Sequence, residues 1–396
     1  MRFAFSTPSM YLVILLATLV ACGNGASAPS PELQGDPPRT FAAHFPEGRW
    51  VSQPCSNEAA CGPFGFAQSE NGPGIENCVG DANLGLLLIG RFLSIAGVPA
   101  NRIARWTGER WEALGAGLDA LAEGLLVHEG DVYAGGAFTR SGALSLNHVA
   151  RWNPNEGWRP LGLGVDAAVR SLTVYRGELI AAGHFRNAGG APAAGIARWD
   201  GERWWPLAGG IEAPLAGGVF AMTVYQDRLI VAGNFSAAGG VAAQNIAVWD
   251  GQSWSALQGG LDDKVYGLEA YGDELYATGD FQYAAGLPTP YVARYSQSTW
   301  AAVGSGFQGD EAKGRALTRW NDLLVAGGNF LEAGGAPAAR VATWNGESWA
   351  PLGEGLNNWV EGLTTYGGKL VACGWFNALA NGGPVGFATY EPSLTP

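Results

Sequence analysis

The stretch from residue 178 to residue 207 decides the fold: Glu178-Leu-Ile-Ala-Ala-Gly-His-Phe185, a Gly-Gly loop, and Ile196-Ala-Arg-Trp-Asp-Gly-Glu-Arg-Trp204-Trp-Pro-Leu207. Short apolar runs separated by turn residues are typical of β-strands. The four-residue turn between Trp199 and Trp204 places the two indoles opposite each other across a hairpin. A single unit of this kind cannot bury its indoles alone, so it has to stack against a neighbour.

This unit recurs along the chain, and each copy carries a Phe that closes its second apolar run. The marker residues recur every 46 to 50 positions, at Phe92, Phe138, Phe185, Phe235, Phe281, Phe330 and Phe376. Periods of roughly 40–50 residues with four strands each are typical of propeller blades. We therefore expect an all-β fold, a seven-bladed β-propeller with four-stranded blades, and six or eight blades are the alternatives.

The last unit lacks one strand. It runs from Val360 through Phe376 to Tyr390 and ends without the Trp-bearing fourth strand of the other units. The segment Gly48-Arg-Trp-Val51, which precedes the first unit, looks like the missing strand. An N-terminal strand that joins the last blade would remove both open edges and close the ring.

The repeated phrase Gly-x-Phe-x-x-Ala-Gly-Gly, followed by Ile-Ala-Arg-Trp-Asp-Gly-x-x-Trp-x-x-Leu, carries a family resemblance. It resembles the repeats of the fungal cortical polarity-marker family and of bacterial delta-60-type propellers. More loosely, it is similar to the kelch and galactose oxidase superfamily. The resemblance covers about residues 80 to 392 and implies a propeller architecture. It implies no activity, because propellers host unrelated functions.

The N-terminus is typical of an exported lipoprotein. Arg2 is followed by a short apolar run that ends in Leu19-Val-Ala-Cys22, which resembles a bacterial lipobox. We expect residues 1–22 to be a lipoprotein signal peptide, with Cys22 acylated and serving as the only membrane anchor. Residues 23–40 are rich in Gly, Ser, Ala and Pro and predict a flexible tether, and residues 41–396 form the propeller domain.

This N-terminus also predicts where the protein resides. No Asp follows Cys22 directly, a pattern that in lipoproteins of this kind indicates the outer membrane of the bacterial cell envelope. The alternative is an ordinary signal peptide and a secreted protein. The net charge of −12 and the absence of a basic cluster argue against a nucleic-acid partner.

Four cysteines remain beside Cys22, an even number that favours disulfides in an exported chain. Three connectivities are open to them. We favour Cys55 with Cys61 and Cys78 with Cys373, because the latter pair would join the first and last blades. The alternative is that one or both pairs stay reduced as small buried residues.

Two tryptophans, Trp359 and Trp375, fall outside the repeat and belong to the last unit. Together with Asn358 they are candidate ligand-binding residues, because exposed aromatic rings beside amides and acids stack on sugars or anchor protein partners. His184 is a fourth candidate. It occupies the position directly before the marker Phe. The residue at this position differs between units although the surrounding residues repeat: Arg91, Ala137, His184, Asn234, Asp280, Asn329 and Trp375. The alternatives are that the tryptophans fill a local gap and that this position is simply exposed.

The loops that lead into the first strand of each unit carry acids or amides. In a propeller these loops gather round one mouth of the central channel, where oxygen ligands could hold Ca²⁺. The speculative calcium ligands are Asp262, Asp263 and Asp310. The alternative is that short polar residues end strands and keep this face soluble. The loop residues are Asp119, Asp166, Glu212, Asp262, Asp263, Asp310, Glu311, Asn357 and Asn358.

Apart from this possible calcium ion, no cofactor is expected. We predict a surface-anchored binding or scaffold propeller, without catalytic activity, that meets a protein or glycan partner at the envelope or outside the cell. The first alternative is a carbohydrate-active enzyme, which would show a deep pocket with two close carboxylates of separated pKa values. The second is a structural envelope protein, which would show no concentrated aromatic patch.

Overall fold

The computed structural model describes residues 45–51, 74–376 and 386–393. All of them belong to one compact unit. The predicted signal peptide, Cys22, the tether, Cys55 and Cys61 lie outside the described residues. No helix among the described residues is long and apolar enough to cross a membrane.

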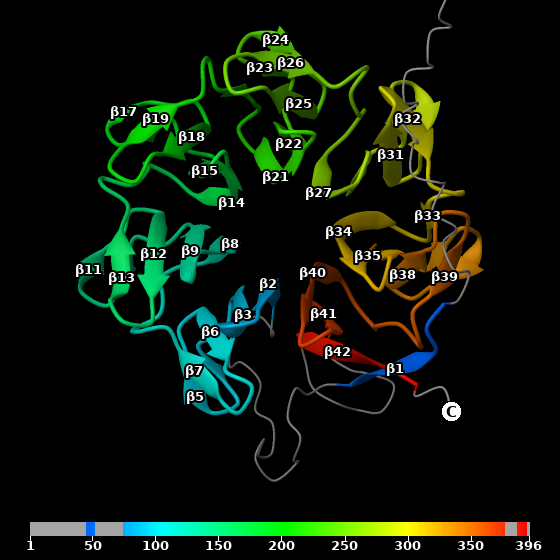
Figure 1. Ribbon diagram of the computed structural model, residues 1–396, viewed down its shortest axis with the longest axis horizontal. Coiled ribbons are helices and arrows are strands. Elements are labelled where there is room, and N and C mark those ends of the chain that lie inside the picture. Colours follow the sequence, from blue (N-terminus) through cyan, green and yellow to red (C-terminus); the bar gives the residue numbers. More distant parts are fainter. Residues whose placement is uncertain (1–44, 52–73, 377–385, 394–396) are drawn as a thin grey trace, which may run out of the picture. The chain divides into compact units, whose positions relative to one another are not determined.

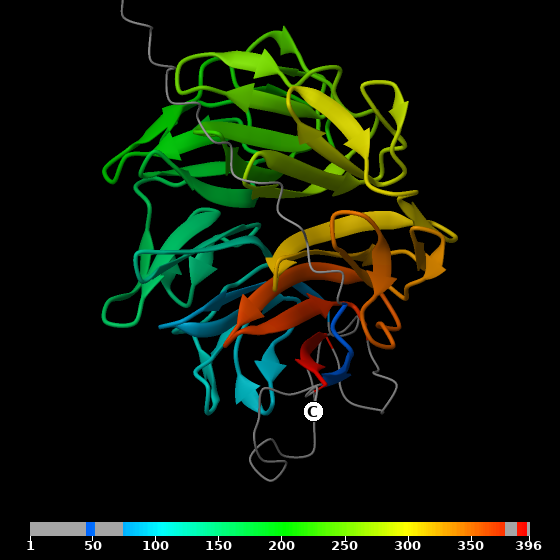
Figure 2. The same cartoon turned by 45° about the vertical axis from the view of Figure 1, so that its right-hand side comes forward.

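The fold is all-β, and the described residues contain seven four-stranded antiparallel sheets. The innermost strand of each sheet contacts the innermost strands of the two neighbouring sheets, and these contacts form a closed cycle (Figure 1). In each sheet the four strands follow one another outward from the central channel (Figures 1 and 2). The innermost strands are β2 (Ile75–Asp81), β8 (Ala122–His128), β14 (Val169–Tyr175), β21 (Gly218–Tyr225), β27 (Val265–Tyr271), β34 (Lys313–Trp320) and β40 (Val360–Tyr366).

Three further strands complete each sheet, and all seven sheets have the same order. The second strands are β3 (Gly85–Gly90), β9 (Asp131–Gly136), β15 (Glu178–Gly183), β22 (Arg228–Asn234), β28 (Glu274–Gly279), β35 (Leu323–Asn329) and β41 (Lys369–Gly374). The third strands are β6 (Ile103–Trp106), β12 (Val149–Asn153), β18 (Ile196–Trp199), β25 (Ile246–Trp249), β31 (Val292–Ser296), β38 (Val341–Trp344) and β42 (Phe387–Pro392). The fourth are β7 (Trp111–Ala113), β13 (Gly157–Pro160), β19 (Trp204–Pro206), β26 (Trp254–Ala256), β32 (Thr299–Ala302), β39 (Trp349–Pro351) and β1 (Gly48–Val51).

Small hairpins of two-residue strands lie between the second and third strands of six sheets. They are β4 (Ser94–Ile95) with β5 (Val98–Pro99), β10 (Arg140–Ser141) with β11 (Leu144–Ser145), β16 (Asn187–Ala188) with β17 (Ala191–Pro192), β23 (Ala237–Ala238) with β24 (Val241–Ala242), β29 (Tyr283–Ala284) with β30 (Leu287–Pro288), and β36 (Glu332–Ala333) with β37 (Ala336–Pro337). The short strands β20 (Ile211–Glu212) and β33 (Phe307–Gln308) pair with β23 and β36.

Each fourth strand carries one tryptophan, and these seven residues form what we call the outer belt. Each has an exposed fraction between 4% and 7%: Trp50, Trp111, Trp158, Trp204, Trp254, Trp300 and Trp349. Five of them donate the indole N–H to a backbone carbonyl of the preceding sheet, for example Trp204 to Leu161 at 2.8 Å. The belt therefore bonds each of these sheets to its neighbour as well as filling the space between them.

The N-terminal strand β1 completes the last sheet. It pairs with β42 over its whole length, with Trp50 opposite Tyr390. Trp50 donates its indole N–H to Leu352 O at 2.9 Å, as four other belt residues do to their own acceptors. The predicted closing strand is therefore present, and its tryptophan replaces the one that the last unit lacks.

A disulfide joins the first and last sheets. Cys78 of β2 is bonded to Cys373 of β41, with Cα atoms 6.3 Å apart and 295 positions apart in sequence. This is the pairing that the sequence favoured. Because a cross-link of this span restricts the unfolded chain, it adds to the stability of the closed ring.

Candidate ligand site at the channel mouth

Every innermost strand contains a β-bulge at the same place. In β14, Val169 lies opposite Gly183 and Ser171 lies opposite Ala182, so that Arg170 is left between them without a partner across the ladder. A bulge bends the strand and re-aims the extra side chain. The seven extra residues form what we call the bulge ring: Glu76, Glu123, Arg170, Phe220, Tyr266, Arg315 and Glu361.

Neighbouring side chains of the bulge ring contact one another around the channel. Arg170 Nε lies 3.3 Å from Glu123 Oε2, and the Arg170 guanidinium lies 5.1 Å from the centre of the Phe220 ring. Phe220 stacks on Tyr266 with the ring centres 5.5 Å apart. The guanidinium of Arg315 covers Tyr266 at 4.1 Å, and Arg315 Nε lies 3.9 Å from Glu361 Oε2. Along this side of the ring, two stacked aromatic rings are therefore flanked on each side by an arginine and then a glutamate.

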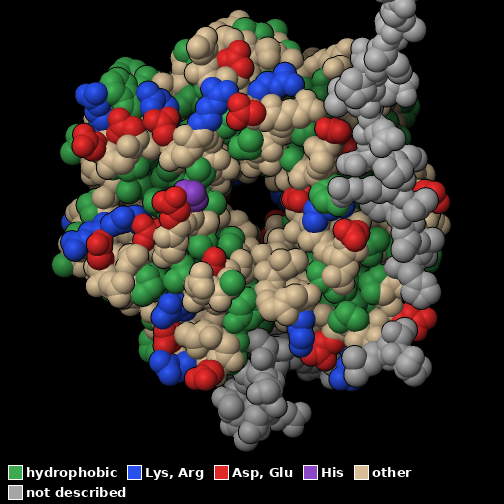
Figure 3. All heavy atoms as spheres, in the orientation of Figure 1, with side chains coloured by type: hydrophobic (Ala, Val, Ile, Leu, Met, Phe, Trp, Pro, Cys, Tyr) green, Lys and Arg blue, Asp and Glu red, His purple; other side chains and the backbone are tan. Residues whose placement is uncertain are grey.

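Two cavities lie along the channel. The upper cavity has a volume of about 510 Å³, within the roughly 300–1,000 Å³ of small-molecule sites. The lower cavity has a volume of about 250 Å³, and all seven bulge-ring residues line it. Figure 3 shows the channel as an opening at the centre of one face. The upper cavity is lined by Glu76, Arg91, Leu121, Glu123, Arg170, Arg315, Asn358, Trp359, Glu361 and Trp375.

Burial and neighbouring charges perturb two bulge-ring residues. Burial raises the pKa of the Glu361 carboxyl, the positive charge of Arg315 opposes this, and the negative charge of Glu76 adds to it. Burial, followed by the charge of Asp280, raises the pKa of Tyr266 to about 12. Tyr266 donates its hydroxyl to Asp280 Oδ2 at 3.0 Å. Tyr266 is therefore a fixed neutral donor, and Glu361 holds its proton more tightly than an exposed glutamate.

The structure brings three of the four predicted ligand-binding residues together, because Asn358, Trp359 and Trp375 all line the upper cavity. A guanidinium lies beside each indole, Arg91 at 5.1 Å from the Trp375 ring and Arg315 at 4.8 Å from the Trp359 ring. Asn358 has a structural task as well. Its amide donates to Trp375 O at 3.3 Å, and its carbonyl oxygen accepts from Trp359 N at 2.9 Å.

His184 lies apart from this group and lines neither cavity. Burial, and then the positive charge of Arg170, lower the pKa of its imidazole. Its Nε2 atom is buried and has no hydrogen-bond partner among the described residues. The variable position before the marker Phe therefore contributes Arg91 and Trp375 to the upper cavity, and His184 only borders the bulge ring through Arg170.

The loop acids have a different role from the predicted one. Asp262 Oδ1 accepts the backbone N–H groups of Gln282 and Tyr283 at 2.9 Å each. Asp119 and Asp166 bind the corresponding N–H groups in their own sheets. These carboxylates fix the start of the small hairpin, and none of the three lines either cavity.

The proposed calcium ligands are therefore not grouped at the mouth. Among the described residues, no three His, Cys, Asp or Glu side chains lie close enough together to hold a metal ion. Asp263 Oδ1 accepts from the N–H of Lys264 at 2.8 Å, and Asp310 is exposed. Calcium binding by Asp262, Asp263 and Asp310 stays a prediction that this geometry does not favour.

Sequence reasoning missed the bulge ring. A signal was present in the sequence, because the bulge-ring position holds Glu, Arg, Phe or Tyr whereas the residue before it is always apolar or glycine. A strand with strict alternation would hide such a residue among ordinary outward positions, and only the backbone register reveals the bulge.

Comparisons with known proteins agree with the fold. No protein-family model matches the chain, and no curated protein matches it, so the resemblance to polarity-marker and delta-60-type repeats stays a prediction. The WD40 β-propeller domain of Doa1 is similar, at 11% identity and a TM-score of 0.50, covering 82% of this chain and 94% of that domain.

Two bacterial extracellular domains are also similar. That of the hybrid two-component system BT3049 from B. thetaiotaomicron has 11% identity and a TM-score of 0.51 over 81% of this chain. That of the one-component system BT4673 from the same organism has 8% identity and a TM-score of 0.50 over 86% of this chain. The match covers 40% of each of those two chains. At these identities the comparisons establish one conclusion, that the chain has a β-propeller fold.

Proposed function

We propose that this protein is a seven-bladed binding propeller that is held at the bacterial cell envelope and takes its ligand at the channel mouth. One observation carries the proposal. The upper cavity, of about 510 Å³, combines two indoles outside the repeat with charged side chains from several sheets. Sites for small molecules or ligand ends combine such apolar surfaces with a few convergent polar groups.

The closed cycle of innermost strands supports seven blades, because each of the seven four-stranded sheets contributes one strand to it. The lipobox at Cys22 supports an acylated anchor in the outer membrane, and the alternative is a secreted protein. Two of the similar structures are extracellular domains, which supports a position outside the cytoplasm. Replacement of Cys22 by Ser is expected to abolish palmitate labelling and to release the protein from the membrane fraction.

Binding rather than catalysis is favoured by the ion pairs in the upper cavity. Glu76, Glu123 and Glu361 each lie within ion-pair distance of an arginine. Such pairing holds the carboxylates in fixed positions, which suits recognition more than proton transfer. The protein or glycan partner therefore meets a rigid polar surface rather than an acid and base pair.

A screen of thermal unfolding tests the proposal. The full chain carrying Cys22→Ser is heated with oligosaccharides, short peptides, amino acids and polyamines. A ligand at a hundred times its Kd adds about 2.7 kcal/mol to the free energy of unfolding and raises Tm. Trp375→Ala is expected to abolish the shift. Trp205→Ala is the matched control, because Trp205 lies on the outer strand β19, away from both cavities.

The outcomes of this screen are clear. A Tm shift that is lost in Trp375→Ala and kept in Trp205→Ala supports binding at the mouth. No shift with any compound, or an equal shift in Trp375→Ala, overturns it.

One observation favours a second candidate, a carbohydrate-active enzyme. Burial and the charge of Glu76 raise the pKa of Glu361, which is the behaviour of a general acid beside a second carboxylate. The test is the release of reducing ends from oligosaccharides. Release that is lost in Glu361→Gln would establish hydrolysis, and the absence of release with every oligosaccharide that raises Tm leaves binding as the function.

A further inference from the structure

The charges that line the upper cavity cancel. Three glutamates, Glu76, Glu123 and Glu361, face three arginines, Arg91, Arg170 and Arg315, and the remaining lining residues are uncharged. A buried charge is costly unless it is paired. A charged ligand would therefore give the cavity a net charge, whereas a neutral ligand would leave the six side chains electrically balanced.

Each glutamate has its own arginine. Arg91 Nε lies 2.8 Å from Glu76 Oε1, Arg170 Nε lies 3.3 Å from Glu123 Oε2, and Arg315 Nε lies 3.9 Å from Glu361 Oε2. Two of these pairs, those of Arg170 and Arg315, join neighbouring innermost strands. Only the pair of Arg91 and Glu76 is also a hydrogen bond, and among the described residues these six side chains form no further hydrogen bond.

The geometry of these pairs leaves donors and acceptors side by side. In each pair the contact uses Nε and one carboxylate oxygen. Among the residues that the structure describes, no hydrogen bond occupies the two Nη groups of the arginine or the second oxygen of the glutamate. A hydroxyl both donates and accepts, so two hydroxyls on adjacent carbons can bridge an arginine and its glutamate. A carboxylate group only accepts and an ammonium group only donates, so neither group by itself can bridge both partners.

The two tryptophans supply the apolar part of the site. Trp359 and Trp375 both line the upper cavity and both are partly exposed. Their guanidinium neighbours, Arg315 and Arg91, belong to the ion pairs described above. Each indole therefore carries the guanidinium of an Arg–Glu pair over its ring, and a sugar that stacks on the same indole lies near that pair. A pyranose has this combination, an apolar C–H face and an edge of hydroxyls.

We infer that the upper cavity binds a neutral sugar unit of a glycan, which stacks on Trp359 or Trp375 and bridges the Arg–Glu pairs with neighbouring hydroxyls. This inference rests on the proposed function, since it names the ligand class of the same site. Uronic acids would bring a carboxylate beside three glutamates, and amino sugars would bring an ammonium beside three arginines. The balance of charge therefore favours a neutral sugar over both charged classes.

The test compares oligosaccharides that differ in charge but share a backbone. The full chain carrying Cys22→Ser is titrated calorimetrically with cello-, malto-, manno- and galacto-oligosaccharides, with oligouronates, and with chitosan oligomers. The expected result is that a neutral oligosaccharide binds at least ten times more tightly than the uronate or amino-sugar oligomer of the same linkage.

Charge variants sharpen the test. Glu361→Gln leaves Arg315 unpaired and is expected to shift the preference at least fivefold toward the uronates. Arg91→Gln leaves Glu76 unpaired and shifts it toward the chitosan oligomers. This second variant also guards against misfolding, because Arg91 lies on the rim with 44% of its side chain exposed. The double variant Glu76→Gln with Arg91→Gln restores the balance and the preference for neutral sugars.

The failures are distinguishable. Tighter binding of uronates, chitosan oligomers, peptides or polyamines by the unaltered cavity overturns the neutral-sugar inference and leaves the proposed binding function intact. An unchanged preference in both Glu361→Gln and Arg91→Gln also overturns the inference. Failure of every compound to bind overturns the proposed function and the inference with it.

Discussion

The outer belt and the bulge ring each take one residue from every one of the seven sheets, the belt from the fourth strands and the ring from the innermost strands. The two sets differ in residue type. The outer belt repeats one residue, tryptophan, with nearly constant burial. The bulge ring repeats a backbone irregularity and fills it with four residue types, Glu, Arg, Phe and Tyr. The comparison teaches that a constant residue in a repeat holds sheets together, and that a varying residue at a constant backbone position is available for recognition.

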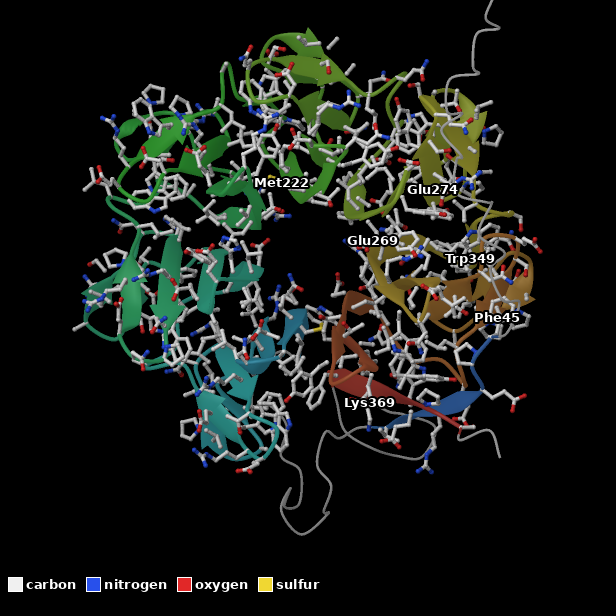
Figure 4. All side chains as sticks on the ribbon, viewed as in Figure 1. Phe45, Met222, Glu269, Glu274, Trp349 and Lys369 are labelled. Atoms are coloured by element: carbon white, nitrogen blue, oxygen red, sulfur yellow. A yellow bond between two sulfur atoms is a disulfide. The ribbon has the colours of Figure 1, made fainter. Side chains whose placement is uncertain are left out.

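The largest effect is expected at the outer belt, where Trp349 lies in the outer part of its sheet (Figure 4). Its indole donates to Val303 O at 2.8 Å and packs against Trp344 and Phe307. Trp349→Ala removes this packing and hydrogen bond and is expected to lower the free energy of unfolding by about 3–5 kcal/mol. Urea unfolding measures the loss.

Trp349→Phe keeps an aromatic ring in the same place and is the matched control, with an expected loss smaller than that of Trp349→Ala. A loss below about 1 kcal/mol for Trp349→Ala would show that the outer belt does not hold the sheets together.

The next effect depends on pH and concerns Glu269 on β27, which Figure 4 shows near the channel between the sheets of β27 and β34. Burial raises the pKa of Glu269 to about 7, and the charge of Arg319 only partly opposes this. The folded state binds this proton more tightly than the unfolded state. The stabilisation by Glu269 is therefore complete below the ordinary glutamate pKa and is lost as the pH rises to about 7.

Glu269→Gln is expected to raise the free energy of unfolding by up to about 3 kcal/mol at pH 8 and to leave it nearly unchanged at pH 4. Urea unfolding at the two pH values measures the difference. Glu354→Gln, at an exposed turn, is the control and should change stability equally at both. A gain for Glu269→Gln that is independent of pH would contradict burial of the charged form.

The smallest effect is expected in the bulge ring itself. Phe220 is partly exposed and lies between Arg170 and Tyr266. Phe220→Ala removes one stacked pair, which contributes about 1 kcal/mol. Urea unfolding should show a loss well below that of Trp349→Ala, and near-ultraviolet circular dichroism should report the changed surroundings of Tyr266. An equal loss at the two sites would erase the distinction between a structural belt and a recognition ring.

The sequence predicted the elements that repeat and the residues that break the repeat. The strands, the closing role of Gly48–Val51 and the partnership of Cys78 with Cys373 follow from period and count, and the structure contains all three. Trp359 and Trp375 were found because they have no counterpart in the other units. Single residues that depart from the repeat in this way can be recognised from the sequence alone.

The position of the bulge ring and the role of the loop acids could not be predicted from the sequence. Bulges depend on which residues face each other across a ladder, and the pairing of Arg170 with Glu123 joins two sheets. Asp119, Asp166 and Asp262 suggested a ring of charge because they repeat, but their repetition reflects a shared structural task at each hairpin. A polar residue that recurs in every unit is better interpreted as structural.

The closing strand has a consequence for how the chain folds. Trp50 and its acceptor Leu352 are 302 positions apart, whereas β14, β15, β18 and β19 lie within about forty residues of one another. Contacts over long separations form late, because the entropy of loop closure opposes them until the intervening chain is ordered. Six sheets can therefore form while the last strand is still missing, and until β42 meets β1 the array has two open edges. A chain that ends before β42 would stay at this open stage, with strand edges free to pair between molecules, and it is expected to aggregate rather than to form a smaller ring.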